Sequence, residues 1–340
     1  MDHVAIDLGS RESQICIRDA HGTIVKESRA CTEKLGELVK KLPERSRVIV
    51  ETSAEAFAVA DIARECRHQV RVVPATLVKS LGVGARGIKT DRRDAQTLSE
   101  VSTRIDLPSV HVPSRASREV QALCGMREAL VETRTKLINS VRGYLRTLLI
   151  RPRGAAIKTF AQRVRETFDK RDIELPRFVE RQLESIEHLC EQIAEADREV
   201  ATAAGEDPVC ARLMTTPGIG PVTALRFVAA IDEVERFSGA HQVESYVGLT
   251  PGERSSGVRT WRTGITKAGR PKLRWALVQA GWAGRRSRHR HDPLFRWVDE
   301  VEKRRGKMVA AVALARKLVG ILYAIWRDGT VYDPSRAAQG

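Results

Sequence analysis

Short runs of hydrophobic residues, each about the length of a strand, recur through the first quarter of the chain. Two of these runs contain an acidic residue near the carboxyl end, Asp7 in one and Glu51 in the other. The predicted strands cover residues 4–10, 13–18, 23–27, 47–51 and 70–73. The first three are separated by short turns, so they predict a strand meander.

Between and after these strands, the apolar residues recur at the three- and four-residue spacing of helices. The predicted helices cover residues 35–42, 54–66, 74–81 and 91–104. Gly82, Gly84 and Gly87 make a loop before the last of them. A meander followed by alternating helices and strands predicts a mixed sheet with helices packed on it.

Asp91 and Asp94 lie three residues apart in the run Lys-Thr-Asp-Arg-Arg-Asp-Ala, so they project from one face of the predicted helix. Neighbouring carboxylates repel each other unless a cation lies between them, and a hard divalent ion such as Mg²⁺ suits oxygen ligands. The alternative is an N-cap residue and a first-turn acid favoured by the helix dipole. Asp7 and Glu51 favour the metal site, because an acid on a central strand is costly unless it is paired or ligates a cation. A ribonuclease H-like fold brings four such acids together around two metal ions.

Two long helical stretches follow, with apolar residues at seven-residue repeats that predict an antiparallel coiled coil. The apolar positions are Val120, Leu123, Leu130, Leu137, Val141, Tyr144 and Leu148 in the first stretch, and Val179, Leu183, Ile186, Cys190, Ile193 and Val200 in the second. Arg127, Arg134 and Asp197 interrupt the pattern. We interpret the stretch as a helical spacer. Two further roles remain open: its outer cations would contact phosphates, or its apolar seam would mediate dimerisation.

The segment Pro-Gly-Ile-Gly-Pro at residues 217–221 predicts a helix-hairpin-helix turn. Gly218 and Gly220 would let backbone amides approach a phosphate, and the next helix offers its positive end. The alternative is a tight turn between packed helices. A last apolar helix is expected at residues 308–326, and residues 327–340 form a tail.

The net charge of +15 and the pI of about 9.9 indicate a polyanionic partner, nucleic acid before membrane. Residues 254–291 contain eleven Lys or Arg and no Asp or Glu, with Trp261, Trp275 and Trp282 interleaved. This run predicts a nucleic-acid surface, although Trp275 and Trp282, seven residues apart, are expected in the core. The candidate nucleic-acid contacts are Lys89, Arg92, Gly218, Gly220, Arg254, Arg259, Lys267, Arg270, Lys272 and Arg274.

Six scattered cysteines without a C-x-x-C pair predict reduced, mostly buried thiols in a cytosolic, hence cytoplasmic, protein. We expect no signal peptide and no apolar stretch of membrane-spanning length.

These motifs, in this order, resemble the DEDD-type insertion-sequence transposases, described as bridge-RNA-guided recombinases. The N-terminal motifs are Ala5-Ile6-Asp7, Val50-Glu51-Thr52 and the run at residues 89–95. The C-terminal motifs are the turn at residues 217–221, Gly248-Leu249-Thr250-Pro251, Ser255-Ser256-Gly257, and residues 265–269 with Leu273-Arg274. Many relatives have glycine after the Ser-Ser-Gly motif, where this chain has Val258.

The resemblance implies an N-terminal ribonuclease H/RuvC-like α/β domain (residues 1–110), a coiled-coil connector (111–205), a mainly helical transposase domain with a helix-hairpin-helix (206–330) and a tail (331–340). It implies metal ligation by Asp7, Glu51, Asp91 and Asp94 with Mg²⁺ or Mn²⁺, and DNA attack by Ser256, with Ser255 left open. The implied partners are DNA, a guide RNA and further copies of the chain in a dimer to tetramer.

Three other functions remain open from the residues alone. A RuvC-like structure-specific endonuclease would use the same acids without a covalent intermediate, and a non-catalytic nucleic-acid-binding protein would use the acids structurally. An actin-like ATPase is suggested by Asp7-Leu8-Gly9-Ser10, but no second phosphate loop of similar form is present.

Overall fold

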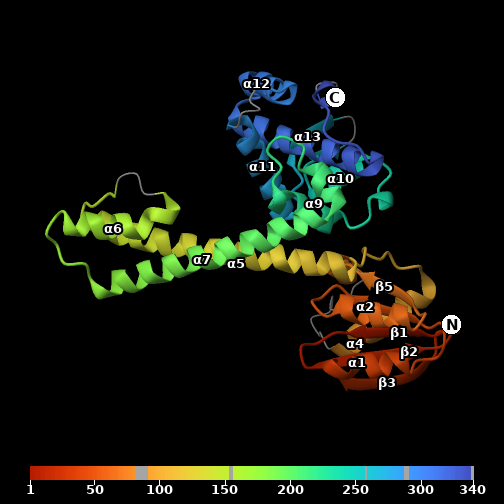
Figure 1. Ribbon diagram of the computed structural model, residues 1–340. Coiled ribbons are helices and arrows are strands. Elements are labelled where there is room, and N and C mark those ends of the chain that lie inside the picture. Colours follow the sequence, from red (N-terminus) through yellow and green to blue (C-terminus); the bar gives the residue numbers. More distant parts are fainter. Residues whose placement is uncertain (81–90, 153–155, 257–258, 287–290, 338–340) are drawn as a thin grey trace. The chain divides into compact units, whose positions relative to one another are not determined.

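The computed structural model describes residues 1–80, 91–152, 156–256, 259–286 and 291–337. It divides into two compact units, Met1–Pro113 and Ser114–Gly340. The first contains a five-stranded sheet with helices, and the second is mainly helical with a two-stranded sheet (Figure 1). The expected mixed sheet with helices is confirmed. The coiled coil and the helix-hairpin-helix stay predictions.

The sheet of the N-terminal unit combines an antiparallel meander with a parallel half. Its strands are β1 (His3–Asp7), β2 (Glu12–Arg18), β3 (Ile24–Cys31), β4 (Arg47–Glu51) and β5 (Gln69–Val73). Their order is β3-β2-β1-β4-β5, in which β3, β2 and β1 are antiparallel and β1, β4 and β5 are parallel. The five strands predicted from the hydrophobic pattern are confirmed. This order is consistent with the ribonuclease H-like fold expected from the resemblance.

Alternation along the strands divides the core of this unit between the two faces of the sheet. Val4, Ile6, Val48 and Val50 pack in one cluster with buried residues of α1 (Leu35–Lys40) and α2 (Ala56–Glu65). Ala5, Ile49 and Val73 pack in the other cluster with residues of α3 (Ala75–Ser80) and α4 (Asp91–Arg104). The central strands are buried on both faces. Strand register alone therefore decides which face of the sheet a polar side chain at the end of a strand occupies.

Two long helices of the C-terminal unit, α5 (Arg115–Thr147) and α7 (Arg177–Glu206), run antiparallel beside each other (Figure 1). The residues that interrupt the predicted apolar seam make contacts across it. Arg127 Nε donates to Asp197 Oδ1 at 2.8 Å, and Arg134 Nη1 lies 3.7 Å from the sulfur of Cys190. Both contacts share one antiparallel register, so these polar residues align the two helices.

The apolar positions of the two long helices divide between two cores. Near the end of the pair, Ile138, Val141, Leu183 and Ile186 pack with a helix that the periodicity did not predict, α6 (Phe160–Asp169). At the opposite end, Val120 and Val200 join the core of the helical body. The predicted continuous seam is therefore capped by a separate small core at its tip.

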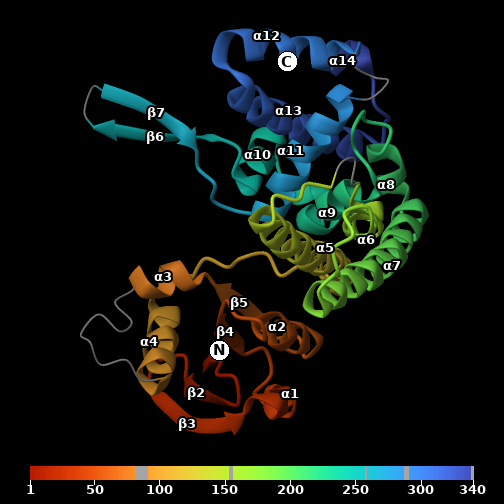
Figure 2. The same ribbon diagram turned by 90° about the vertical axis from the view of Figure 1, so that its left-hand side faces the viewer.

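The helical body surrounds a single large apolar cluster. Its helices are α8 (Pro208–Leu213), α9 (Pro221–Ile231), α10 (Ala240–Val247), α11 (Pro271–Arg286), α12 (Pro293–Arg305), α13 (Lys307–Asp328) and α14 (Pro334–Ala337). Between α10 and α11, β6 (Pro251–Ser256) and β7 (Arg259–Ile265) form an antiparallel hairpin that extends away from the helices (Figure 2). The sequence pattern did not predict this hairpin.

Among the described residues, one helix is long and apolar enough, by length and composition, to cross a membrane. It is α13, whose most apolar stretch has a mean hydropathy of 1.9. The expectation that no stretch reaches this length is therefore wrong. Half of the stretch is buried, with Leu314, Leu318 and Leu322 in the apolar cluster, as in the central helix of a folded domain.

All six cysteines are free thiols, as expected. Cys16, Cys124 and Cys210 are buried, whereas Cys31 is exposed. Burial raises the pKa of the Cys16, Cys124 and Cys210 thiols. These thiols are therefore protonated at neutral pH and serve as core residues.

The small core at the tip of the long helices should contribute measurable stability. Replacing the fully buried Leu183 by alanine leaves a cavity between α5, α6 and α7 and should cost about 2–5 kcal/mol. Met126→Ala, on the same helix pair but 71% exposed, should change stability by less than about 0.5 kcal/mol. Urea denaturation followed by helical circular dichroism measures both, and equal effects would contradict a packed core at the tip.

Candidate active site

Asp7 and Glu51 lie side by side at the carboxyl ends of β1 and β4. These strands are parallel neighbours, and Ile6 is paired with Val50, so the next residue of each strand is at the same level. Neighbouring strands are about 4.8 Å apart. Ala5 and Ile49, two residues earlier, face the cluster that contains α4 residues. The two-residue alternation therefore places both acids on the face of the sheet that α4 covers.

Asp94 comes to the same face from the helix. It is 8% exposed, and Leu98 and Val101, four and seven residues later, pack with Ala5 and Ile49. Residues at this spacing share one side of a helix, so Asp94 is on the side of α4 that faces the sheet. Asp91 is the first residue of α4, three residues before Asp94. Three dispersed acids thus share one face of the sheet, with the fourth at the start of the covering helix.

Carboxylate oxygens at the ends of strands and on a covering helix are the donors that hard divalent cations prefer. Within the described parts of the chain, no group of three or more His, Cys, Asp or Glu side chains is arranged to hold a metal ion. Asp7, Glu51 and Asp94 have the donor chemistry for Mg²⁺ or Mn²⁺ and share one face of the sheet, but they do not form a ready-made metal-binding group in this structure. Metal binding by these residues stays a prediction.

Arg92 ties the first turn of α4 to the sheet. Its guanidinium forms an ion pair with Glu27 of β3, with Nε 3.1 Å from Oε2. Gln96, one turn further along, also donates to Glu27. The hydrogen bonds from Arg92 and then Gln96 lower the pKa of Glu27. Arg92, predicted as a nucleic-acid contact, thus binds a protein carboxylate in this structure, and Lys89 lies outside the described residues.

Ser256 is the last residue of β6, at the turn of the hairpin. Its backbone pairs with Arg259, and that of Ser255 pairs with Thr260. Only two residues, outside the described part, separate the strands. Arg254 also belongs to β6 and pairs with the exposed Trp261. The candidate nucleophile and two candidate cations, Arg254 and Arg259, are therefore grouped at the end of a projecting hairpin (Figure 2).

Two arginines at the base of this hairpin link α10 to the start of α11. Arg274 donates from Nη1 to the carbonyl of Val247 at 2.7 Å, and Arg270 donates from Nη2 to the hydroxyl of Tyr246 at 2.7 Å. The Arg270 guanidinium also stacks over the Tyr246 ring. Both side chains were predicted as phosphate contacts, but here they bind protein groups. Lys267, just after β7, is exposed.

The turn at residues 217–221 packs closely on α11. Gly218 has a φ of +87°, and a β-carbon there would lie 2.2 Å from the carbonyl oxygen of Ala280. Gly220 is the N-cap of α9 with a φ of −103°, and a β-carbon there would meet nothing within 4 Å. The tight-turn alternative explains why residue 218 is a glycine. At Gly220, the space beside the backbone stays open, so a phosphate can approach the N-terminus of α9.

Two family comparisons cover most of the chain. Residues 4–150 match a DEDD-type family described as "Transposase", and residues 210–296 match the "Transposase IS116/IS110/IS902 family". The chain belongs to this transposase family.

Several curated relatives have similar length. The chain is 29% identical to the transposase for insertion sequence element IS1328 of Yersinia enterocolitica, over 97% of this chain and 98% of the relative. It is 29% identical to a probable family 20 transposase of Pseudomonas aeruginosa, over 98% and 99% of the two chains. It is 31% identical to the transposase for IS1111A of Coxiella burnetii, over 70% and 66%.

Three features of this transposase were not found from its sequence. Trp275 was expected in the core but is 61% exposed, whereas Trp282 is half-buried beneath the cations of Arg285 and Lys307. The hairpin was missed, although residues 259–265 alternate polar and apolar side chains in part. Glu128 of α5 binds Arg226 and Lys272, each at 2.9 Å, and no sequence pattern signalled this pairing.

The two glycines of the 217–221 turn provide a matched pair. Gly218→Ala should destabilise the protein by about 2–4 kcal/mol, because alanine is strained at this φ and overlaps α11. Gly220→Ala should cost about 1 kcal/mol or less, the difference between the two residues at an N-cap. Thermal unfolding compares the two variants, and similar losses of stability would mean that the turn does not pack on α11 as described.

Proposed function

We propose that this transposase cuts and rejoins DNA strands of an insertion sequence through a covalent link to Ser256. The single observation that carries the catalytic part is the shared face of Asp7, Glu51 and Asp94, reached from two parallel strands and one helix. Membership of a transposase family supports DNA as the substrate. Asp91, at the start of the same helix, completes the proposed set of acids.

Strand exchange has to retain the energy of the broken phosphodiester, because the strand must be rejoined without ATP. In the proposed step, the Ser256 oxygen forms a bond to phosphorus while the bond from phosphorus to the 3′ oxygen breaks. The serine proton leaves as the oxygen attacks, and the 3′ oxygen takes up a proton as it departs. The reverse reaction, with a new 3′ hydroxyl, releases the serine and forms the recombined strand.

Mg²⁺ or Mn²⁺, when bound by the four acids, would lower the pKa of the attacking hydroxyl and stabilise charge on the leaving oxygen. The chain's own contribution is position. The hairpin presents Ser256 at its end with Arg254 and Arg259 beside it in the strand register, and these cations would hold the phosphate.

The acids and Ser256 belong to different units of the chain. We propose that the active assembly is a homo-oligomer in which these groups meet, and that a guide RNA selects the DNA. Both parts of this proposal rest on the family resemblance. An RNA guide would account for specificity without a base-reading module of the protein.

Ser256 should be the site of a protein–DNA adduct. The test combines purified protein with the RNA transcribed beside its own reading frame and a plasmid that carries the flanking DNA. Denaturation, nuclease digestion and mass spectrometry should find a nucleotide on Ser256 in the natural protein, none in Ser256→Ala, and an adduct still present in Ser255→Ala. Cleavage without any adduct would instead support the hydrolytic endonuclease.

The acids should be needed for cleavage and not for DNA binding. Asp7→Asn, Glu51→Gln and Asp94→Asn should each slow cleavage at least about 100-fold, and chelation by EDTA should do the same until Mg²⁺ or Mn²⁺ is restored. DNA affinity should remain within about threefold. Glu65→Gln, on the helix that covers the opposite face of the sheet, is the control and should leave the rate unchanged. Full activity of the three acid variants would remove the acids from the mechanism.

A further inference from the structure

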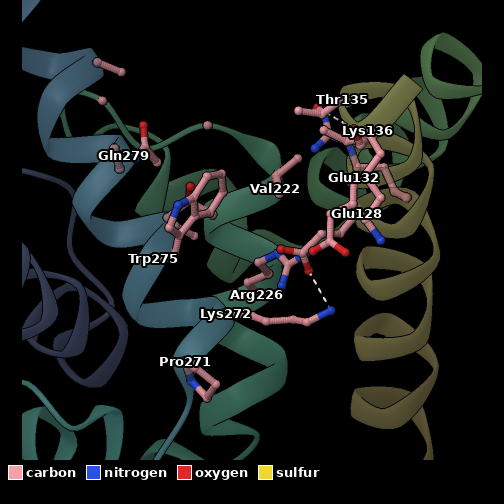
Figure 3. Close-up of a pocket in the computed structure, with 18 residues that line it drawn as sticks. Glu128, Glu132, Thr135, Lys136, Val222, Arg226, Pro271, Lys272, Trp275 and Gln279 are labelled. Carbon is pink, nitrogen blue, oxygen red and sulfur yellow. Dashed lines mark hydrogen bonds and ion pairs between the residues drawn. The ribbon is translucent and has the colours of Figure 1, made fainter. Parts of the chain in front are cut away.

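A cavity of about 830 Å³ lies in the C-terminal unit between α5, α9 and α11 (Figure 3). Trp275 and Gln279 line it from α11, and Glu132 and Lys136 line it from α5 on the other side. Val222 of α9 lies between these two walls (Figure 3). This volume is in the range of cavities that hold small organic ligands.

The wall from α11 presents an open aromatic face. Trp275 is 61% exposed, and among the described residues no ring or cation stacks on it. Trp282, two turns further along α11, differs because two cations cover its ring. The free indole face of Trp275 is therefore available for a flat ligand.

The surroundings of Trp275 offer both apolar contact and groups that bind the edge of a ring. Ala276, Ala280 and Val222 make an apolar floor, and the carboxamide of Gln279 provides a donor and an acceptor. Gly220 is open, so its backbone lets a ligand approach closely. A nucleobase has flat apolar faces and polar edges, so it matches these surroundings.

The charges around the cavity favour an anion. The lining residues include four cations and two acids: Arg127, Lys136, Arg226, Lys272, Glu128 and Glu132. Arg127 is paired with Asp197, and Glu128 is shared by Arg226 and Lys272, so one of these three cations lacks a carboxylate of its own. Lys136 forms no ion pair within the described part of the chain. A phosphate attached to a base in the cavity would therefore meet positive charge.

We propose that this cavity binds an unpaired nucleotide, whose base stacks on Trp275 and whose phosphate lies near Lys136 and Lys272. The inference rests on the proposed function, since it assigns a second contact to the same nucleic-acid substrate. The helix that carries Trp275 follows the Ser256 hairpin directly in the chain and belongs to the same unit. A duplex keeps its bases stacked, so the site selects a single-stranded or extruded nucleotide.

The test measures binding of fluorescently labelled twelve-nucleotide strands, oligothymidine and oligouridine, by anisotropy over a range of salt concentrations. Trp275→Ala should weaken binding of at least one strand about 5- to 100-fold, the loss expected for one stacked base. The slope of log affinity against log salt should stay the same, because no phosphate contact is removed. Trp275→Phe should keep affinity within about threefold, and the DNA and RNA arms identify which strand occupies the site.

Three controls separate this inference from a structural effect. Phe178→Ala removes an aromatic residue of similar exposure, 58%, from another part of the unit and should leave affinity unchanged. Lys136→Gln should reduce the salt slope by about one. A strand of abasic nucleotides should bind the natural protein and Trp275→Ala equally.

Equal affinity of the natural protein and Trp275→Ala for both strands would overturn the inference. The result is independent of strand cleavage, because Ser256→Ala should bind both strands like the natural protein. A serine adduct together with binding that does not depend on Trp275 would reject only this cavity. Binding that depends on Trp275 without any serine adduct would reject only the covalent mechanism.

Discussion

Register between two buried parallel strands is the constraint on which the N-terminal unit depends. β1 and β4 are buried on both faces, so their side chains alternate strictly between two apolar clusters. The pairing of Ile6 with Val50 brings Asp7 and Glu51 to one level and one face. A shift of one residue would move each acid to the opposite face and expose apolar residues, so packing of the core also positions the acids.

The positive charge of the C-terminal unit has two different uses. Some cations hold the fold: Arg127 pairs with Asp197, Arg226 with Glu128, and Arg274 with the carbonyl of Val247. Burial raises the pKa of Glu128, but its bonds to Lys272 and Arg226 outweigh that effect and lower it. Cations such as Lys136 and Lys267 form no such pair within the described residues, and a role in nucleic-acid binding stays a prediction for them. Net charge indicated the class of partner, and only the contacts separate these two uses.

Local patterns were sufficient for regular elements with a strong period. Helix α4 occupies residues 91–104 and β4 residues 47–51, as the hydrophobic spacing predicted, because both signals come from neighbouring residues. The hairpin was missed because a polar hairpin has a weak period, whereas α6 was missed although Phe160, Val164 and Phe168 recur at helical spacing. Trp275 was wrongly expected in the core. Its spacing from Trp282 places both residues near one side of α11 but does not say which part of that side remains exposed. The roles of the four acids and Ser256 stay predictions.

The order of strands and helices in the N-terminal unit, the sign of the charge and the identity of the chemical groups follow from the amino-acid sequence, because each depends on residue type and short-range spacing. Family membership follows from the order of motifs along the chain. The shared face of Asp7, Glu51 and Asp94, the arginines at the base of the hairpin and the open indole of Trp275 were decided only by tertiary packing. Each of these depends on residues distant in the chain, whose contacts no local pattern encodes.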